Sequence, residues 1–89
     1  MSKNGSAAVI ADEAPCDDAL TEYDHAHFVI YARLLDAVAE GACEHEIMRT
    51  VLAIDPVQEP IRAKRRLDSH LRRARWLSAH GYRHLVRHP

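Results

Sequence analysis

Apolar side chains recur at helical spacing in several stretches of the chain, and the first stretch ends at a glycine. It runs from about Tyr23 to Glu40, with Thr21 or Asp24 as a possible N-cap and Gly41 directly after it. Glycine adopts the left-handed conformation without a steric penalty, so Gly41 fits a helix C-cap. The pattern therefore predicts a first helix over residues 23–40.

Two further helices are predicted after Gly41. A short one covers about residues 44–52, and a long one runs from about Ile61 to His80. Between them, Pro56 and Pro60 interrupt the helical pattern, because proline lacks a backbone N–H and restricts the residue before it. Pro60 also fits the first position of the last helix. We therefore expect an all-α fold of three helices with a long turn between the second and the third.

Residues 1–20 have a different composition, made up mainly of small, polar and acidic side chains without a periodic apolar pattern. Such a segment cannot bury enough apolar surface to offset the conformational entropy lost on ordering. We divide the chain into a disordered acidic leader, residues 1–20, and a helical domain, residues 21–89. An alternative function for the leader is a short peptide that docks on a partner.

The first predicted helix carries more apolar surface than a three-helix core requires. One stripe is expected to face the core: Phe28, Tyr31, Ala32, Leu35, Val38 and Ala39. A second stripe widens the apolar surface and consists of His27, Ile30, Leu34 and Ala37. Exposed apolar patches of this kind are typical of protein interaction sites. We therefore predict that these four residues contact a partner protein.

The last predicted helix is sharply two-sided. Its core stripe is Ala63, Leu67, Leu71, Ala74 and Ser78, with His70 and Leu77 beside it. The opposite face is basic and holds the candidate DNA contacts Arg62, Arg65, Arg66, Ser69, Arg72 and Arg73. Trp76 lies near the centre of this face, and it is either covered by a terminal turn containing Tyr82, Leu85 and Val86 or left as an anchor for a protein partner.

Charge is strongly segregated along the chain. Residues 1–60 carry a net charge of −9 and residues 61–89 a net charge of +8, although the total is only −1. Such segregation favours a surface for nucleic acid or another charged partner. Two helices joined by a turn, with a basic face on the second, form the arrangement of a helix-turn-helix. Direct DNA binding through that face is therefore one hypothesis for function.

Acidic residues argue against strong DNA binding. In a helix-turn-helix, the second helix and the turn approach the phosphate backbone, and this chain places four acids there: Glu44, Glu46, Asp55 and Glu59. An unpaired carboxylate near phosphate opposes the electrostatic part of the affinity. Alternatively, the acids pair with the arginine face within the chain, as exposed ion pairs of small individual energy.

Other functional classes find little support in the residues. No apolar run approaches the length of a membrane-spanning helix or a signal peptide, so we expect a cytoplasmic protein. Cys16 and Cys43 are interpreted as free thiols. The candidate metal ligands His25-x-His27, Cys43-x-His45 and His80/His84/His88 lack the spacing of a known closed site. We expect no catalytic, cofactor or metal site, no membrane contact and a monomer.

Three short motifs in a fixed order resemble a known family. They are Gly41-Ala42-Cys43-x-x-Glu46-Ile47, Leu71-Arg72-Arg73-Ala74-Arg75, and Gly81-Tyr82-Arg83 with Leu85. Together they resemble, over about residues 23–86, an extended-turn helix-turn-helix variant first catalogued as a domain of unknown function. The family is also known as the DNA-binding domain of type VI secretion transcription factors. Its members are often the C-terminal half of activators on mobile elements, where the opposite face contacts an N-terminal companion domain.

The resemblance also implies a partner. We expect this chain to lack the companion domain, and a stand-alone acidic copy is similar to the QseM-like antiactivators. These bind the companion domain of a cognate activator and block genes for excision and conjugative transfer of the element. The resemblance therefore implies an antiactivator whose partner is an activator with a related domain, with DNA binding weak or absent. Two departures are Cys43, where a Ser-like cap is expected, and the retained arginine cluster.

Overall fold

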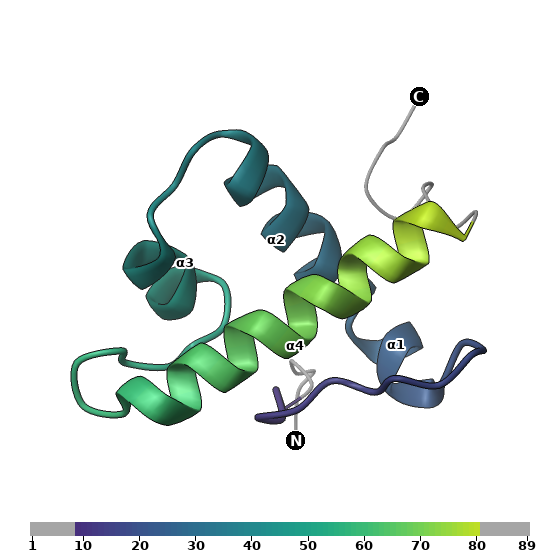
Figure 1. Cartoon of the computed structure of the whole chain (residues 1–89), viewed down its shortest axis with the longest axis horizontal. Helices are drawn as coiled ribbons and strands as arrows, with labels where there is room; N and C mark the ends of the chain where they lie inside the picture. The colour runs from purple at the N-terminus through teal and green to yellow at the C-terminus, as the bar shows by residue number, and fades with distance from the viewer. Residues whose placement is uncertain (1–8, 81–89) are drawn as a thin grey trace, which may run out of the picture.

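The computed structural model describes residues 9–80, which form four helices and no strand. The helices are α1 (Glu22–Ala26), α2 (Phe28–Ala39), α3 (Glu44–Thr50) and α4 (Pro60–Ala79). Figure 1 shows α4 crossing the whole molecule, with α2 packed on it, α3 near its first half and α1 near the N-terminal segment. The all-α prediction is confirmed for these residues, none of whose helices is both long and apolar enough to cross a membrane.

Buried apolar side chains form two clusters along α4. The larger cluster joins α2, α3, the turn after it and the first half of α4, and contains Leu34, Ile47, Met48, Val51, Leu52, Ile54, Ala63 and Leu67. The smaller cluster contains Tyr31, Ala74 and Leu77, with Leu20, Phe28, Leu35 and Trp76 packed against it. The core positions predicted for α4 are therefore largely confirmed, whereas Val38 and Ala39 of the stripe predicted on α2 are exposed.

The single first helix predicted over residues 23–40 is divided at His27. This residue leaves the helical conformation, with φ −121° and ψ 19°, and its backbone N–H donates to the carbonyl of Asp24. Its side chain replaces the helical bond that is lost, because Nδ1 lies 2.7 Å from the carbonyl oxygen of Tyr23. The imidazole also stacks on the Tyr23 ring, with 3.8 Å between ring centroids. The side chain of His27 thus spans the break between α1 and α2.

The ends of the helices follow the local sequence. Thr21 caps α1 in a reciprocal box with Asp24, as one of the two predicted N-caps. Gly41 ends α2 with φ +82°, and the N–H groups of Gly41 and Ala42 donate to the carbonyls of Val38 and Ala37, which is a Schellman motif. Pro60 occupies the first turn of α4 as predicted. Cys43 is the N-cap of α3 but makes no side-chain capping bond.

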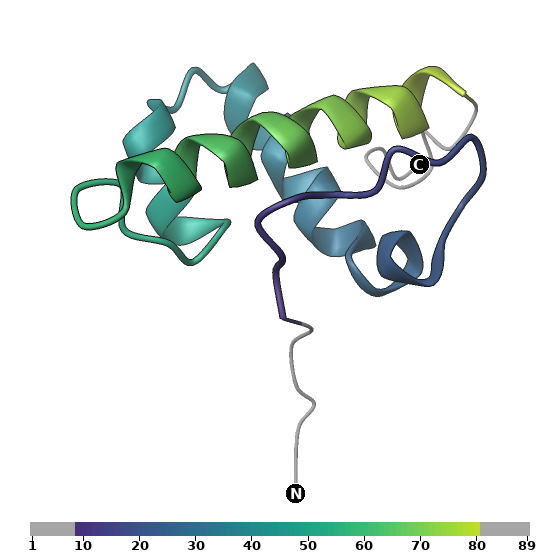
Figure 2. The ribbon, with the colours of Figure 1, turned by 60° about the horizontal axis from the view of Figure 1, so that its bottom comes forward.

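The boundary of the predicted disordered leader is wrong. Residues 9–20 follow a defined path beside α4 and then enter α1 (Figure 2), and Ala14 is only 5% exposed. Composition failed here because the ordering is provided by contacts with a helix about 50 positions further along the chain. Residues 1–8, and the predicted terminal turn with Tyr82, Leu85 and Val86, lie outside the described residues.

Candidate functional site

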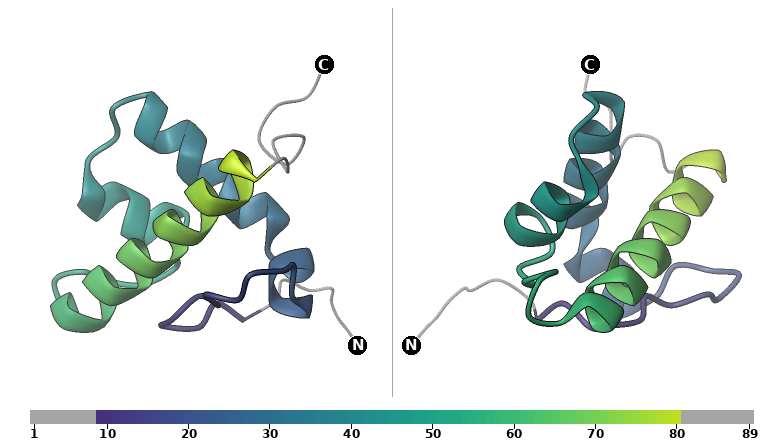
Figure 3. Two further views of the ribbon diagram at one scale, coloured as in Figure 1. Left: turned by 45° about the vertical axis from the view of Figure 1, so that its right-hand side comes forward. Right: turned by 60° about the vertical axis from the view of Figure 1, so that its left-hand side comes forward.

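The basic face of α4 is covered by the N-terminal segment, residues 9–19. The two views in Figure 3 show the segment crossing below the ribbon of α4. We call the residues Arg62, Arg65, Arg66, Ser69, Arg72 and Arg73 the arginine face. Each of them contacts the N-terminal segment through a hydrogen bond or an ion pair. The arginine face and the segment over it form the candidate site.

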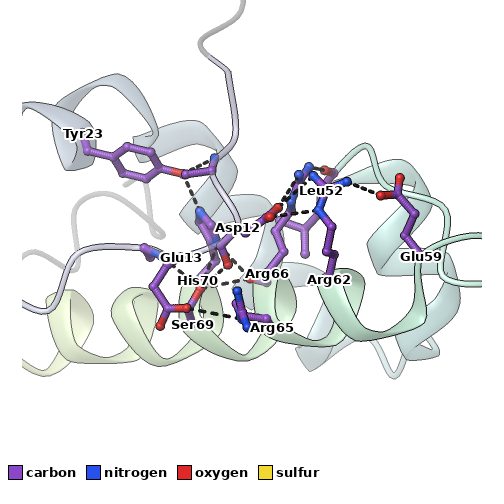
Figure 4. A network of polar contacts seen from close by, with 12 residues as sticks. Asp12, Glu13, Tyr23, Leu52, Glu59, Arg62, Arg65, Arg66, Ser69 and His70 are labelled. Atoms are coloured by element: carbon purple, nitrogen blue, oxygen red, sulfur yellow. Dashed lines mark hydrogen bonds and ion pairs between the residues drawn. The ribbon is translucent and has the colours of Figure 1, made fainter.

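Asp12 is the centre of the contact near the start of α4 (Figure 4). Its Oδ2 accepts from Nε of Arg62 at 2.9 Å, and its Oδ1 accepts from Nη2 of Arg62 at 3.1 Å and from Nη2 of Arg66 at 2.8 Å. These bonds hold the pKa of Asp12 well below its usual range and raise that of Arg62, which also pairs with Glu59. A carboxylate thus bridges two guanidinium groups at the surface.

Glu13 and Ala14 continue the contact along the helix. The Glu13 carboxylate lies 3.9 Å from Nε of Arg65 and 3.7 Å from Nη2 of Arg72, which are loose, exposed ion pairs. The backbone N–H of Ala14 donates to Oγ of the buried Ser69 at 3.0 Å. We call Asp12, Glu13 and the arginines that they contact, namely Arg62, Arg65, Arg66 and Arg72, the outer cluster.

A second, deeper contact lies near the end of α4, and we call it the inner cluster. The guanidinium of Arg73 bonds both carboxylate oxygens of Asp24, at 3.1 and 2.6 Å, and the carbonyl oxygens of Asp17 and Ala19, at 2.6 and 2.9 Å. Asp24 also accepts from the Tyr31 hydroxyl at 2.7 Å. Burial alone would raise the pKa of Asp24, but the bonds from Arg73, from the Thr21 backbone and from Tyr31 lower it to about 2.

Between the two clusters, a chain of hydrogen bonds attaches Ala11 to α4 (Figure 4). Nδ1 of His70 lies 2.7 Å from the carbonyl oxygen of Arg66, which can only accept, so this nitrogen carries the proton. Nε2 is then free to accept from the Tyr23 hydroxyl at 2.5 Å, and the Tyr23 oxygen accepts from the N–H of Ala11 at 3.1 Å. Burial lowers the pKa of His70, consistent with a neutral ring.

The arginine face was expected to be exposed, and this expectation is only partly correct. Arg66, Ser69 and Arg73 are buried, at 8%, 2% and 3% exposed, because the N-terminal segment lies over them. Arg62, Arg65 and Arg72 remain exposed although their charges are paired. The helical stripe was correctly placed by its spacing, but spacing alone cannot show what packs on a stripe.

The expectation that the second apolar stripe on α2 is exposed must also be corrected. Leu34 is fully buried in the core, and His27 is 3% exposed between Tyr23 and the carbonyl of Val9, to which Nε2 is 2.9 Å away. Ile30 and Ala37 are half-buried against the same core. The prediction assigned this surface to a partner. Instead, Leu34, Ile30 and Ala37 share one core cluster with residues of α3, the turn after it and α4, and His27 lies against Tyr23 and the N-terminal segment.

Trp76, the fifth predicted partner contact, is half-buried. The guanidinium carbon of Arg73 lies 4.3 Å from the centre of the indole, and the ring of His80 stacks on it with 4.3 Å between centroids. With Pro15, Cys16, Arg72 and Arg73 it lines a small hollow of about 100 Å³. Of the five residues predicted to contact a partner, Trp76 is therefore the one that lies at the edge of the arginine face.

The acids of α3 and of the turn before α4, which were expected to oppose DNA binding, make contacts away from the N-terminal segment. Glu59 pairs with Arg62, and Glu44 pairs with Lys64 at 3.4 Å, while Asp55 accepts from the N–H of Val57 in the turn before α4. The hypothesis that these acids pair with the arginine face therefore holds for Glu59, whereas Glu44 pairs with Lys64, which lies outside that face. The acids that cover the arginine face are others, namely Asp12, Glu13 and Asp24. The position of Asp12 and Glu13 in a supposed leader concealed this role.

Cys16 and Cys43 are free and exposed, as interpreted from the sequence. Within residues 9–80, no group of three or more His, Cys, Asp or Glu side chains is placed to hold a metal ion. A scan of the chain against protein-family models finds no match, and a search of curated proteins finds none either. The physical description of the site therefore rests on the chain's own geometry.

Proposed function

We propose that this protein is a transcriptional antiactivator. It binds an activator that carries a related domain, through the activator's N-terminal companion domain, and blocks genes for excision and conjugative transfer of a mobile element. The three sequence motifs that resemble the QseM-like antiactivators motivate this choice of partner. The supporting observation in the structure is that acidic residues of the chain cover the arginine face of α4.

That observation distinguishes the proposal from the alternative, a helix-turn-helix regulator that binds DNA directly. In the alternative, Arg62, Arg65, Arg66, Ser69, Arg72 and Arg73 must reach phosphates or base edges. In the closed arrangement each of them contacts the N-terminal segment instead. A small helical scaffold with its basic face occupied supports action through protein contacts.

The partner surface must also be chosen again, because Leu34 and His27 are buried. On α2, Val29 is 70% exposed and adjoins the half-buried Ile30. We assign the contact to this side of α2, with Ile30 and Ala37 at its margins, and keep Trp76 on α4 as a separate candidate contact. A charged substitution at Val29 can test the assignment without opening the core.

The experiment measures capture of a candidate activator by the tagged full chain. The candidate is an activator with a related helix-turn-helix domain from the same genome, and transcription from its target promoter is the second measurement. We expect the native chain and Val57→Asp to capture the activator and repress the promoter, and Val29→Asp to do neither. Val57 is the matched control because it is 66% exposed in the turn before α4.

Two outcomes would contradict the proposal. One is that no activator of this type is captured by the native chain. The other is a gel shift of promoter DNA by the native chain at micromolar concentration and low salt, which is the behaviour of a direct DNA-binding regulator. Equal capture by Val29→Asp and the native chain would overturn the assigned surface.

A further inference from the structure

We propose that the N-terminal segment is a displaceable intramolecular competitor, which keeps the arginine face of α4 closed to nucleic acid until Asp12 and Glu13 leave it. The proposal concerns regulation within this chain and does not depend on the activator partner. Three observations carry it: the geometry of the Asp12 contact, an unpaired donor on Arg66, and the unequal strength of the two clusters.

The first observation is that Asp12 occupies a position suited to a phosphate group. Its carboxylate receives three bonds from Arg62 and Arg66 within 3.1 Å. Arginine pairs provide the same charge-assisted geometry for carboxylate and for phosphate. Arg65 and Arg72 lie further along the same helix, paired with Glu13. The segment thus presents two consecutive anionic groups to a row of guanidiniums, as a nucleic-acid backbone does.

The second observation is that Arg66 is not fully satisfied by Asp12. Its Nη1 donates to the carbonyl oxygen of Leu52 and its Nη2 to Asp12, but the buried Nε has no hydrogen-bond partner among residues 9–80. An arginine side chain that is 8% exposed with an unused donor is unusual, because buried donors are nearly always bonded. A phosphate has more acceptor oxygens than a carboxylate and can occupy the Nε and Nη2 positions together.

The third observation is that the charged contacts of the segment are buried at one end and mostly exposed at the other, where Arg66 is the buried arginine. Residues 17–24 are fixed by the buried Arg73, which bonds two backbone carbonyls and Asp24. At the other end, the Arg62, Arg65 and Arg72 side chains in contact with Asp12 and Glu13 are 48%, 59% and 64% exposed. Exposed ion pairs are individually weak and screened by salt. Residues 9–14 can therefore leave the arginine face while the inner cluster stays in place.

The test compares two double variants of the full chain that change its net charge equally. Asp12→Asn with Glu13→Gln removes the competing charges. Asp36→Asn with Glu40→Gln is the control, because these exposed side chains at the end of α2 make no ion pair in the described residues. Binding of a short fluorescent DNA duplex of arbitrary sequence is measured by anisotropy at low salt. We expect Asp12→Asn/Glu13→Gln to bind about tenfold or more tightly than the native chain, since neutralised phosphate contacts dominate such affinity.

The control double variant is expected to bind as weakly as the native chain. Adding Arg62→Gln and Arg65→Gln to Asp12→Asn/Glu13→Gln should remove the gained affinity. Equal binding by the two double variants would show a net-charge effect and overturn the proposal. Binding of poly-glutamate, but not of DNA, by Asp12→Asn/Glu13→Gln would overturn the assignment to nucleic acid.

A second measurement serves if a variant fails to fold, and it uses the native chain. The N–H of Ala14 is buried and bonded to Ser69, so its hydrogen exchange reports closure of the segment. Raising the salt concentration, which screens the exposed ion pairs of Asp12 and Glu13, should accelerate exchange at Ala14 while exchange within the second half of α4 stays slow. Unchanged exchange at Ala14 at high salt would show that the segment does not leave the arginine face and would overturn the proposal.

Discussion

The inner and outer clusters both join an aspartate to arginines of α4, and they differ mainly in exposure. The side chains of Asp24 and Arg73 are 0% and 3% exposed, whereas those of Asp12 and Arg62 are 30% and 48% exposed. A buried charge that loses its partner has no water to replace it, but an exposed one does. The same chemistry can therefore hold the fold at one point of the helix and form a contact that opens at another.

The largest expected effect comes from removing Arg73. Arg73→Met leaves the Asp24 carboxylate buried without its counter-charge, and the carbonyls of Asp17 and Ala19 without their donor. We expect the free energy of unfolding to fall by about 3–5 kcal/mol, the usual cost of breaking a buried pair on one side. Urea unfolding followed by circular dichroism measures it.

Arg75→Met provides the control for Arg73→Met, because Arg75 is exposed on the same helix. Its effect should lie within about 0.5 kcal/mol of zero, as for most surface substitutions. A loss below about 1 kcal/mol for Arg73→Met would show that the inner cluster does not hold the fold.

Acidification should have a smaller, graded effect, and it should weaken the Tyr23–His70 connection before the inner cluster. Burial lowers the pKa of His70, so the stabilisation from the neutral ring is fully present above its ordinary pKa of 6.5 and decreases as the pH falls. The pKa of Asp24 is lowered to about 2, so its contribution is present above about pH 4 and disappears as the pH falls through about 2. The bonds from Tyr23 to Ala11 should therefore weaken well before the inner cluster.

Hydrogen exchange at Ala11, measured from pH 7 to pH 5 and corrected for its intrinsic pH dependence, checks this order. We expect its protection to decrease in the native chain and to change much less with pH in His70→Gln. The control is His25→Gln, since His25 is exposed on α1. If protection of Ala11 stayed constant down to pH 4, the Tyr23–His70 connection would not depend on the charge of His70.

The smallest expected effect is that of Arg62→Met on stability. Arg62 pairs with Asp12 and Glu59 at the surface, and Asp12 keeps its bond from Arg66 when Arg62 is replaced. We expect the unfolding curve to be nearly unchanged and protection of the Ala14 amide to fall several-fold. An unfolding midpoint lowered as far as that of Arg73→Met would show that the two clusters do not differ.

Much of the fold could be predicted from local sequence. Helical spacing located the residues of α2 and α4, and Gly41 and Pro60 marked where elements end and begin, because their backbone preferences act locally. The break at His27 could not be predicted in the same way. It depends on a side chain whose two ring nitrogens lie 2.7 Å and 2.9 Å from the carbonyl oxygens of Tyr23 and Val9, and Val9 lies 18 positions away.

The site was harder to predict because it depends on pairing between distant segments. The two-sided pattern of α4 identified the arginine face, but the same pattern describes a solvated face, a DNA-binding face and a covered one. Asp12 is 54 positions from Arg66, and Asp24 is 49 from Arg73. The lack of a periodic apolar pattern in residues 9–20 indicated disorder. The segment is instead ordered by buried ion pairs, backbone bonds and the apolar contacts of Ile10, Ala14 and Leu20.

The distance along the chain between Asp12 and Arg66 also matters while the protein is being made. Ribosomes add about 5–20 residues per second, so roughly 3–10 s pass between synthesis of Asp12 and that of Arg66. During this interval the nascent chain carries an acidic N-terminal segment that has no arginines to bind. We expect the segment to dock only when α4 emerges, so its contacts with the arginine face are among those that form late on the nascent chain.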